Sequence, residues 1–292
     1  MDAILAIIAA MGHEKDIDLA TFKQSPLYQQ IVTKLIKKQK LTFILPAFPA
    51  KSSNRNKTYS SMPDLGELLA LKRLQKMCEE INALYAPHSE VIICSDGRVF
   101  NDLVFVSDHE LAAYDQKIKI MIHDFKLTNL KTYSLDDFYQ ENAKEQLLNN
   151  FAPPLESIKE MVKNDASTLH MFNGVHRFIK DDLSFNATFI SKNRLHKQSK
   201  EIAYQVIQRS RAWDNLLAHV FSQTLRLSIH PYPLTHHKFG IELVRGQDRW
   251  ATPWHNVVLK IKDSYQLVKR IEALRQGAKL KMFAGEYAYY EI

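Results

Sequence analysis

Short apolar runs that break abruptly into polar residues recur along the chain. Residues 41–45 form one such run, closed by Pro46, and residues 91–94 form another, which ends in Ser95-Asp96-Gly97-Arg98. A continuous apolar run bounded by turn residues is typical of a strand buried in a parallel sheet. The same reasoning predicts further strands at 102–106, 226–229 and 257–261. The pattern therefore places charged side chains where buried strands stop.

Between these runs, apolar residues recur at helical spacing. Leu27, Ile31 and Leu35 mark a helix within residues 17–40, and further helices are predicted at 68–85, 109–124, 135–165 (with a break at 151–154) and 200–221. Strands that alternate with helices favour an α/β fold with a parallel sheet. No internal repeat or linker divides the chain. We therefore expect one α/β domain over 1–292, with N-terminal helices in 1–40 and a mostly helical insertion at about 125–200 that could act as a lid.

Composition narrows the classes of protein. The 292 residues carry 39 basic and 32 acidic side chains, which gives a net charge of +7. A positive net charge is typical of proteins that bind nucleic acid, an acidic membrane surface or an anionic substrate. The charge is scattered rather than gathered into a basic stripe with interleaved aromatic residues, which counts against nucleic acid. Cys78 and Cys94 have no partner at ligand spacing, so we expect no disulfide framework, no thiolate zinc site and a cytoplasmic protein. The apolar residues 1–11 are too short to span a bilayer and predict a packed helix.

Familiar catalytic motifs are missing from the sequence. None of the eight glycines falls in a dinucleotide-binding or phosphate-loop motif, and no HExxH, GxSxG or CxxC occurs. The adjacent His236 and His237 point apart, so we predict no metal site there.

The remaining candidates for a functional site are polar residues at the ends of the predicted strands. The loop after the first strand carries Lys51, Ser52 and Asn54, which could bind a phosphate or form an exposed basic loop. Asp96, Arg98 and Asp102 follow the second strand, either as functional groups or as a turn with a surface ion pair. His230 ends a later strand and His255 precedes the last one; each could be catalytic or structural.

Six segments, in order along the chain, resemble the pyoverdine/dityrosine biosynthesis family, the isonitrile synthases. They are residues 45–52, 62–67, 94–100, 209–213, 226–231 and 252–256. The resemblance extends from about 41 to 260 but matches no motif between 125 and 200. It implies a Rossmann-like α/β fold. It also implies conversion of the α-amino group of tyrosine or tryptophan into an isonitrile, whose carbon comes from the carbonyl carbon of ribulose 5-phosphate.

The resemblance further implies that the reaction needs no metal or organic cofactor. From the scattered charge and the short apolar segment we expect no nucleic-acid or membrane partner. A separate iron/2-oxoglutarate oxygenase is the expected downstream partner. Within this family interpretation we expect four groups of site residues: acid–base catalysis by His230, His255, Asp96 and Glu67; sugar-phosphate binding by Lys51, Ser52, Asn54 and Arg98; orientation of substrate by Asp102; and an aromatic pocket wall at Trp254. Two alternatives stay open: a sugar-phosphate enzyme of another reaction type, or a basic nucleic-acid-binding module.

Overall fold

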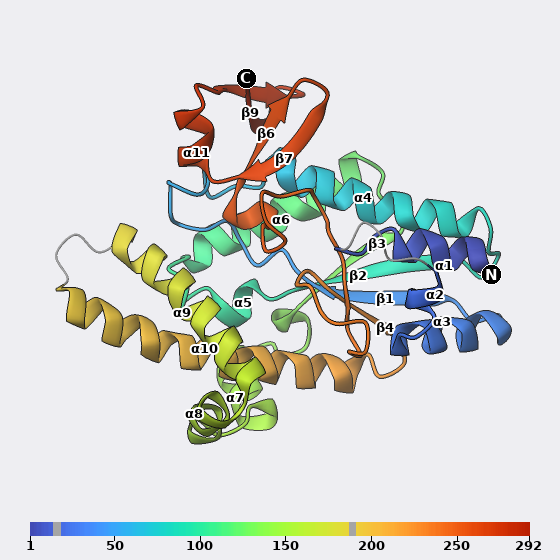
Figure 1. The fold of residues 1–292 in the computed structure, drawn as a ribbon, viewed down its shortest axis with the longest axis horizontal. Helices are drawn as coiled ribbons and strands as arrows, with labels where there is room; N and C mark the ends of the chain where they lie inside the picture. The colour runs from blue at the N-terminus through green and yellow to red at the C-terminus, as the bar shows by residue number, and fades with distance from the viewer. Residues whose placement is uncertain (14–18, 187–190) are drawn as a thin grey trace.

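A five-stranded parallel sheet forms the centre of the molecule in the computed structural model, which describes residues 1–13, 19–186 and 191–292 (Figure 1). The strand order is β3-β2-β1-β4-β5. The strands are β1 (Leu41–Pro46), β2 (Ser89–Ser95), β3 (Leu130–Ser134), β4 (Leu225–Ser228) and β5 (Phe239–Gly240). The predicted α/β class is confirmed, as are the strands expected at 41–45, 91–94 and 226–229.

Side chains that alternate along β1 divide the interior into two cores. Phe43 and Leu45 pack with the N-terminal helices and with α4 and α6, whereas Ile44 packs on the opposite face with Trp213 of α10. The N-terminal half contributes α1 (Asp2–Ala9), α2 (Leu19–Phe22), α3 (Pro26–Ile36), α4 (Leu65–Asn82), α5 (Gly97–Phe100) and α6 (Asp108–Asp124). The helix expected at 17–40 is thus two helices, because Ser25 caps a new one at Pro26; residues 17 and 18 lie outside the described residues.

The predicted helical insertion is present but starts later than expected. It comprises α7 (Ala143–Phe151), α8 (Leu155–Asn164), α9 (Ala166–Asn186) and α10 (Lys192–Val220), which run between β3 and β4. The range 125–200 also contained β3 and the 3₁₀ helix η1 (Leu135–Asp137). The sequence did not predict β3, because it is an edge strand with one fully buried side chain, Leu130, and therefore lacks a continuous apolar run.

The strand predicted at 102–106 is wrong. The chain leaves β2 through α5 and then turns. The side-chain amide of Asn101 donates to the carbonyl oxygen of Val106 at 3.1 Å and closes this turn. Phe105 has φ of 61°, a left-handed conformation that a strand cannot contain. Leu103 and Val106 are buried by this turn, which explains the apolar pattern that suggested a strand.

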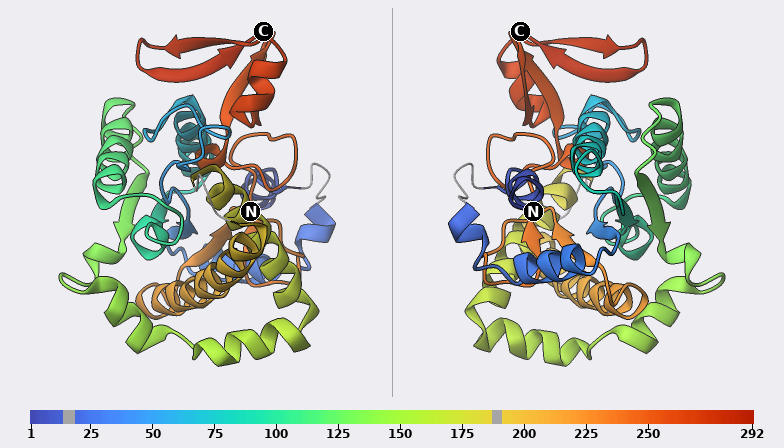
Figure 2. Two further views of the ribbon diagram at one scale, coloured as in Figure 1. Left: turned by 90° about the vertical axis from the view of Figure 1, so that its left-hand side faces the viewer. Right: turned by 90° about the vertical axis from the view of Figure 1, so that its right-hand side faces the viewer.

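The strand predicted at 257–261 is confirmed, but it belongs to a second sheet. This four-stranded sheet has the order β7-β6-β9-β8 and lies at the opposite end of the molecule from α7 and α8 (Figure 2). Its elements are β6 (Val257–Ile261), β7 (Ser264–Val268), α11 (Arg270–Arg275), β8 (Lys279–Phe283) and β9 (Tyr287–Glu291), preceded by the 3₁₀ helix η2 (Pro253–His255). Among the described helices, none has the length and apolar character needed to cross a membrane.

Candidate active site

The carboxyl edge of the large sheet holds the candidate site. From β1 the chain continues to β2 on one side of the sheet, whereas β4 pairs with β1 on the other, so the strand order reverses beside β1. Ligands of open α/β proteins bind in the crevice outside such a reversal. A cleft of about 1090 Å³ includes this edge: it lies between the ends of β1, β2 and β4 and the helices α8, α9 and α10, and it extends along α3 and residues 221–224. Of the predicted site residues, Asp96 and His230 line this cleft.

Asp96 stands directly after β2 with a free carboxylate oxygen. Its Oδ1 atom is buried and has no hydrogen-bond partner in the part of the chain that the structure describes. Burial raises the pKa of Asp96 to about 7; the carboxylate of Asp214 acts in the same direction and the guanidinium of Arg226 opposes it. A carboxyl group with such a pKa can both take up and release a proton near neutral pH.

The position after Asp96 has room only for a glycine. A Cβ atom at this position would lie 2.0 Å from the carbonyl oxygen of Pro49, which belongs to the loop after β1. The loop can therefore approach the end of β2 only because the side chain is missing. The Asp-Gly pair thus brings two strand ends together at the cleft.

Two histidines lie near each other on the other side of the site. His230 is exposed to the cleft, yet the protein around it, together with the charges of His13 and Lys238, lowers its pKa to about 4. His255 is half-buried; its Nδ1 lies 3.2 Å from Oγ1 of Thr252, and its ring packs 4.7 Å from that of Phe178 on α9. Burial also holds the pKa of His255 well below its usual range. Both imidazoles are therefore neutral near pH 7 and able to accept a proton.

Lys51 lies behind the cleft wall in a buried ion cluster. Its Nζ is 2.8 Å from Oδ2 of Asp64 and 2.9 Å from Oε2 of Glu67, and the side chain is fully buried. Burial opposes the charge of Lys51, but the two carboxylates outweigh it and raise its pKa. Burial raises the pKa of Asp64 to about 7 despite the adjacent ammonium group. Asp64 and Glu67 also form the capping box that begins α4, so this cluster joins the loop after β1 to that helix.

The polar residues that follow Lys51 hold α9 in place. Asp182 of α9 is buried and accepts hydrogen bonds from Ser52 (3.4 Å), Asn54 (3.0 Å) and Lys57 (2.6 Å). Sequence reasoning missed Asp182, because it lies in the segment where no motif could be recognised. We call this set of contacts the α9 clamp.

The remaining predicted residues are engaged elsewhere. Arg98 forms ion pairs with Asp108 (2.8 Å) and Asp136 (3.1 Å). Asp102 accepts from Arg209 of α10 at 2.7 Å and from Lys144 at 2.8 Å; burial opposes its charge, but these bonds outweigh burial and lower its pKa to about 2. Trp254 is buried against Phe48, with ring centroids 5.4 Å apart.

A group of three cations in the cleft was not among the predicted site residues; a fourth cation, Lys34 of α3, also lines the cleft. Arg211 comes from α10, Arg226 from β4 and Lys238 from the segment before β5, and all three line the cleft with Asp214. Arg211 and Arg226 lie in the segments 209–213 and 226–231 that the sequence singled out. Within the described ranges, no group of three or more His, Cys, Asp or Glu side chains is placed to hold a metal ion.

Comparisons with known proteins agree on one family. The family model described as "Pyoverdine/dityrosine biosynthesis protein" matches residues 31–281. L-tryptophan isonitrile synthase AmbI2 of Fischerella ambigua is 39% identical over 252 residues, which are 85% of this chain and 76% of that protein. L-tyrosine isonitrile synthase of Pseudomonas aeruginosa is 38% identical over 260 residues, 86% of this chain and 79% of that protein. The crystal structure of PvcA from Pseudomonas aeruginosa superposes with a TM-score of 0.90 at 35% identity and covers 99% of this chain and 98% of that one.

Proposed function

The chain belongs to the pyoverdine/dityrosine biosynthesis family, and on that premise we propose that it is an isonitrile synthase acting on tyrosine or tryptophan. The observation that carries the proposal is the similarity to both a tryptophan and a tyrosine isonitrile synthase over 85–86% of the chain. The family model, which matches residues 31–281, includes all the residues that line the cleft except Gln29 and Gln30.

We propose ribulose 5-phosphate as the carbon donor, without a metal or organic cofactor. The amine attacks the ketone carbon, and loss of water gives an imine. For that carbon to become the isonitrile carbon, both of its carbon–carbon bonds must break. The atoms balance if C1 of the sugar leaves as formaldehyde, C3 to C5 leave as hydroxyacetone, and the phosphate leaves as inorganic phosphate. The enzyme is then of the carbon–carbon lyase type. Each of these steps moves protons, which requires groups that exchange protons near pH 7.

Asp96 and His230 are the acid–base groups that we place next to the substrate. Both line the cleft. Asp96, with a pKa of about 7, can act as acid or base, whereas His230, with a pKa of about 4, is neutral near pH 7 and can accept a proton. His255 lies close enough for the two imidazoles to influence each other, and we assign it a supporting role in proton transfer. We assign Glu67 to the support of Lys51, because it is fully buried and bonded to that ammonium.

The other predicted residues shape the cleft. Lys51 is fully buried between two carboxylates, and Ser52 and Asn54 bond Asp182. Two carboxylates also neutralise the charge of Arg98. We therefore assign these four residues to the support of the elements that border the cleft. Asp102, which fixes Arg209 of α10, and Trp254, which supports the loop after β1, have the same role.

We also propose that the product passes to a separate iron/2-oxoglutarate oxygenase in the cytoplasm. The two cysteines, Cys78 and Cys94, are buried free thiols, which suits a reducing compartment.

The direct test is to incubate the purified protein with each aromatic amino acid and ribulose 5-phosphate that carries ¹³C at the carbonyl carbon. Trapping with a tetrazine should yield a labelled isonitrile adduct from tyrosine or tryptophan. Omission of either substrate is the control. Consumption of the sugar phosphate without amino acid would support the alternative sugar-phosphate enzyme, and absence of product from every aromatic amino acid would refute the synthase.

A further inference from the structure

The cations of the cleft outnumber the carboxylates that contact them. Arg226 and Lys238 both bond the carboxylate of Asp214, one to each oxygen. Arg211 donates to Oγ1 of Thr168 at 3.3 Å, and among residues 1–13, 19–186 and 191–292 it forms no ion pair. Among the described residues, Asp214 is therefore the one carboxylate that forms ion pairs with this group of three cations.

Two guanidinium groups of this cluster also have unused donors. Nε of Arg211 and Nη1 of Arg226 are buried, and neither has a hydrogen-bond partner in the described chain. Buried N–H groups of a charged side chain are normally paired, because an unpaired one loses its hydration without compensation. Both donors belong to residues that line the cleft, so an anion bound there would supply the missing acceptors.

Neighbouring titratable groups remove the excess charge only in part. Asp96, with a pKa of about 7, is within electrostatic range of Arg226, and Asp165 is within electrostatic range of Arg211. His230, His236 and His237 line the same cleft, and burial lowers the pKa of each, so they are neutral near pH 7. Burial lowers the pKa of Lys238 as well, and the charges of Arg226 and Arg211 act in the same direction. Lys238 therefore lies within electrostatic range of both guanidinium groups.

We propose that Arg211, Arg226 and Lys238 form the anion-binding site of the cleft and that it takes the phosphate monoester of the sugar substrate. The proposal rests on the proposed function for the identity of the substrate, but the anion site itself follows from the cluster alone. Guanidinium groups bind phosphate and carboxylate through parallel N–H···O bonds, and a lysine adds a point charge. A phosphate dianion matches the surplus of two positive charges over Asp214. The α-carboxylate of the amino acid has the same acceptor chemistry and is the second source to test.

The cluster also sets the direction of the substrate. Asp96 lies close enough to Arg226 and Asp214 for their charges to alter its pKa. A sugar phosphate anchored on the three cations would thus extend its carbonyl end toward the free carboxylate oxygen of Asp96. The site would hold the phosphate on α10 and β4 while proton transfer occurs at the end of β2.

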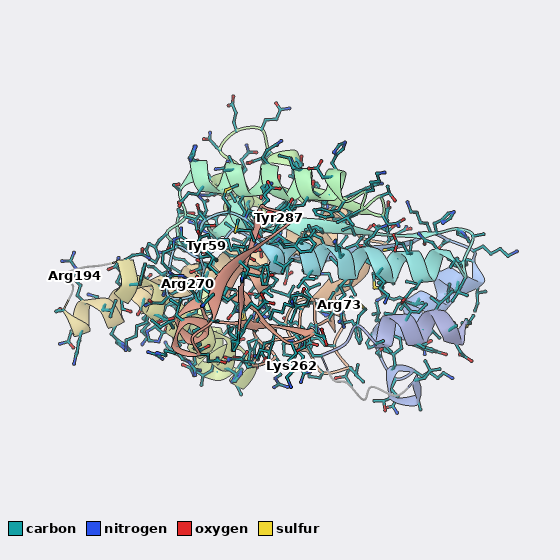
Figure 3. All side chains as sticks on the ribbon, turned by 90° about the horizontal axis from the view of Figure 1, so that it is seen from above. Tyr59, Arg73, Arg194, Lys262, Arg270 and Tyr287 are labelled. Carbon is teal, nitrogen blue, oxygen red and sulfur yellow. The ribbon has the colours of Figure 1, made fainter. Side chains whose placement is uncertain are left out.

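The experiment measures binding by calorimetry to the full-length protein and to the variants Arg211→Gln, Arg226→Gln and Lys238→Gln. The titrants are inorganic phosphate, ribulose 5-phosphate, the aromatic amino acid and its uncharged amide. The matched control is Arg194→Gln, an exposed arginine near the start of the same helix, at the outer tip of the molecule (Figure 3). We expect each cleft variant to weaken binding of phosphate and ribulose 5-phosphate about ten- to hundredfold, with the control unchanged.

The outcomes separate the two anions. Weaker binding of both phosphate ligands, with the amino acid unaffected, supports the phosphate site. If the amino acid alone weakens and its preference over the amide disappears, the cluster binds the carboxylate instead, which overturns the phosphate assignment. Unchanged affinities throughout would overturn the anion site.

If a variant does not fold, two further measurements still test the anion site. Arg211→Lys keeps the charge and should retain part of the affinity, and inorganic phosphate should raise the melting temperature of the unaltered protein more than chloride at equal ionic strength. Equal shifts with both salts count against the site. If the protein binds phosphate here but forms no isonitrile, the proposed function is refuted and the anion site stands. If the protein forms the isonitrile but all three variants bind the sugar phosphate as the parent does, the anion site is refuted and the proposed function stands.

Discussion

Charged side chains at the carboxyl edge of the sheet differ in whether the protein itself neutralises them. Lys51, Lys57 and Arg98 each contact two carboxylates, and such pairs hold segments of the chain together. Asp96 and Arg211 instead keep buried polar atoms without a partner in the described chain. Unpaired buried polar atoms oppose folding, so their presence in the cleft points to a substrate that pairs them.

Asp96→Asn tests the free carboxyl group. Because burial raises the pKa of Asp96 from 3.8 to about 7, the folded protein retains a proton that the unfolded chain has released between about pH 4 and pH 7. The free energy of unfolding therefore falls as the pH rises through that window, by up to ~4 kcal/mol for a shift of about three units. The amide removes this loss, so the variant should be more stable than the parent protein at pH 8.

The same change should lower kcat about 10²- to 10⁴-fold and remove a limb of the kcat–pH profile that rises through about pH 7, as expected for a general base. Chemical denaturation at pH 5 and pH 8 checks the stability, and the tetrazine assay checks the rate. A variant with the parent kcat would contradict the acid–base role of Asp96.

Lys51→Met tests the buried ion cluster. Removing the ammonium leaves Asp64 and Glu67 buried side by side without a counter-charge, which should cost about 3–5 kcal/mol of unfolding free energy. The control Lys163→Met breaks an exposed pair with Glu160 and should leave the melting temperature unchanged. A stable variant with a raised KM for ribulose 5-phosphate alone would restore the phosphate role that the sequence predicted for Lys51.

At the scale of elements, the α9 clamp fixes the insertion against the site. Asp182→Asn weakens the bonds from Lys57 and Asn54, so we expect a loss of about 3 kcal/mol and faster amide hydrogen exchange in α9. Asp181→Asn is the matched control, since Asp181 also contacts Lys57 at 2.9 Å but is 48% exposed, and it should cost less than about 1 kcal/mol. Equal effects of the two changes would mean that the buried contact does not hold α9.

Elements were predictable where burial leaves a periodic pattern. β1, β2, α4 and α10 carry such patterns because each is buried on at least one face. The exposed strand β8 carries none: none of its five side chains is buried, and it is held by backbone pairing with β9. The turn at 101–105 led to the opposite error: it buries Leu103 and, with it, Val106, so a compact turn has an apolar run that resembles a strand.

At the scale of the whole molecule, the sequence predicts which polar residues follow the strands of the sheet but not which partners each of them contacts. The topology of parallel strands brings their carboxyl ends together whatever the loops contain, so Asp96 and His230 could be expected in one crevice. Ion pairs depend on tertiary packing. Asp182 reaches Asn54 across 128 residues, and nothing in either local sequence announces the contact. For the same reason Arg211 could be read from the sequence as a surface cation.

The positive charge of the molecule and of its cleft should act on the sugar phosphate from a distance. The chain carries a net charge of +7, and Arg211, Arg226 and Lys238 concentrate positive charge in a concave site. We expect kcat/KM for ribulose 5-phosphate to fall severalfold when the ionic strength rises from about 0.01 to about 0.15 M, where the Debye length shortens from ~30 to ~8 Å. The zwitterionic amino acid should show little dependence, which makes it the internal control. If kcat/KM falls equally for both substrates, the salt acts on the protein as a whole and not on attraction of the dianion. If the cleft causes the effect, Lys238→Gln should make kcat/KM for ribulose 5-phosphate less dependent on ionic strength.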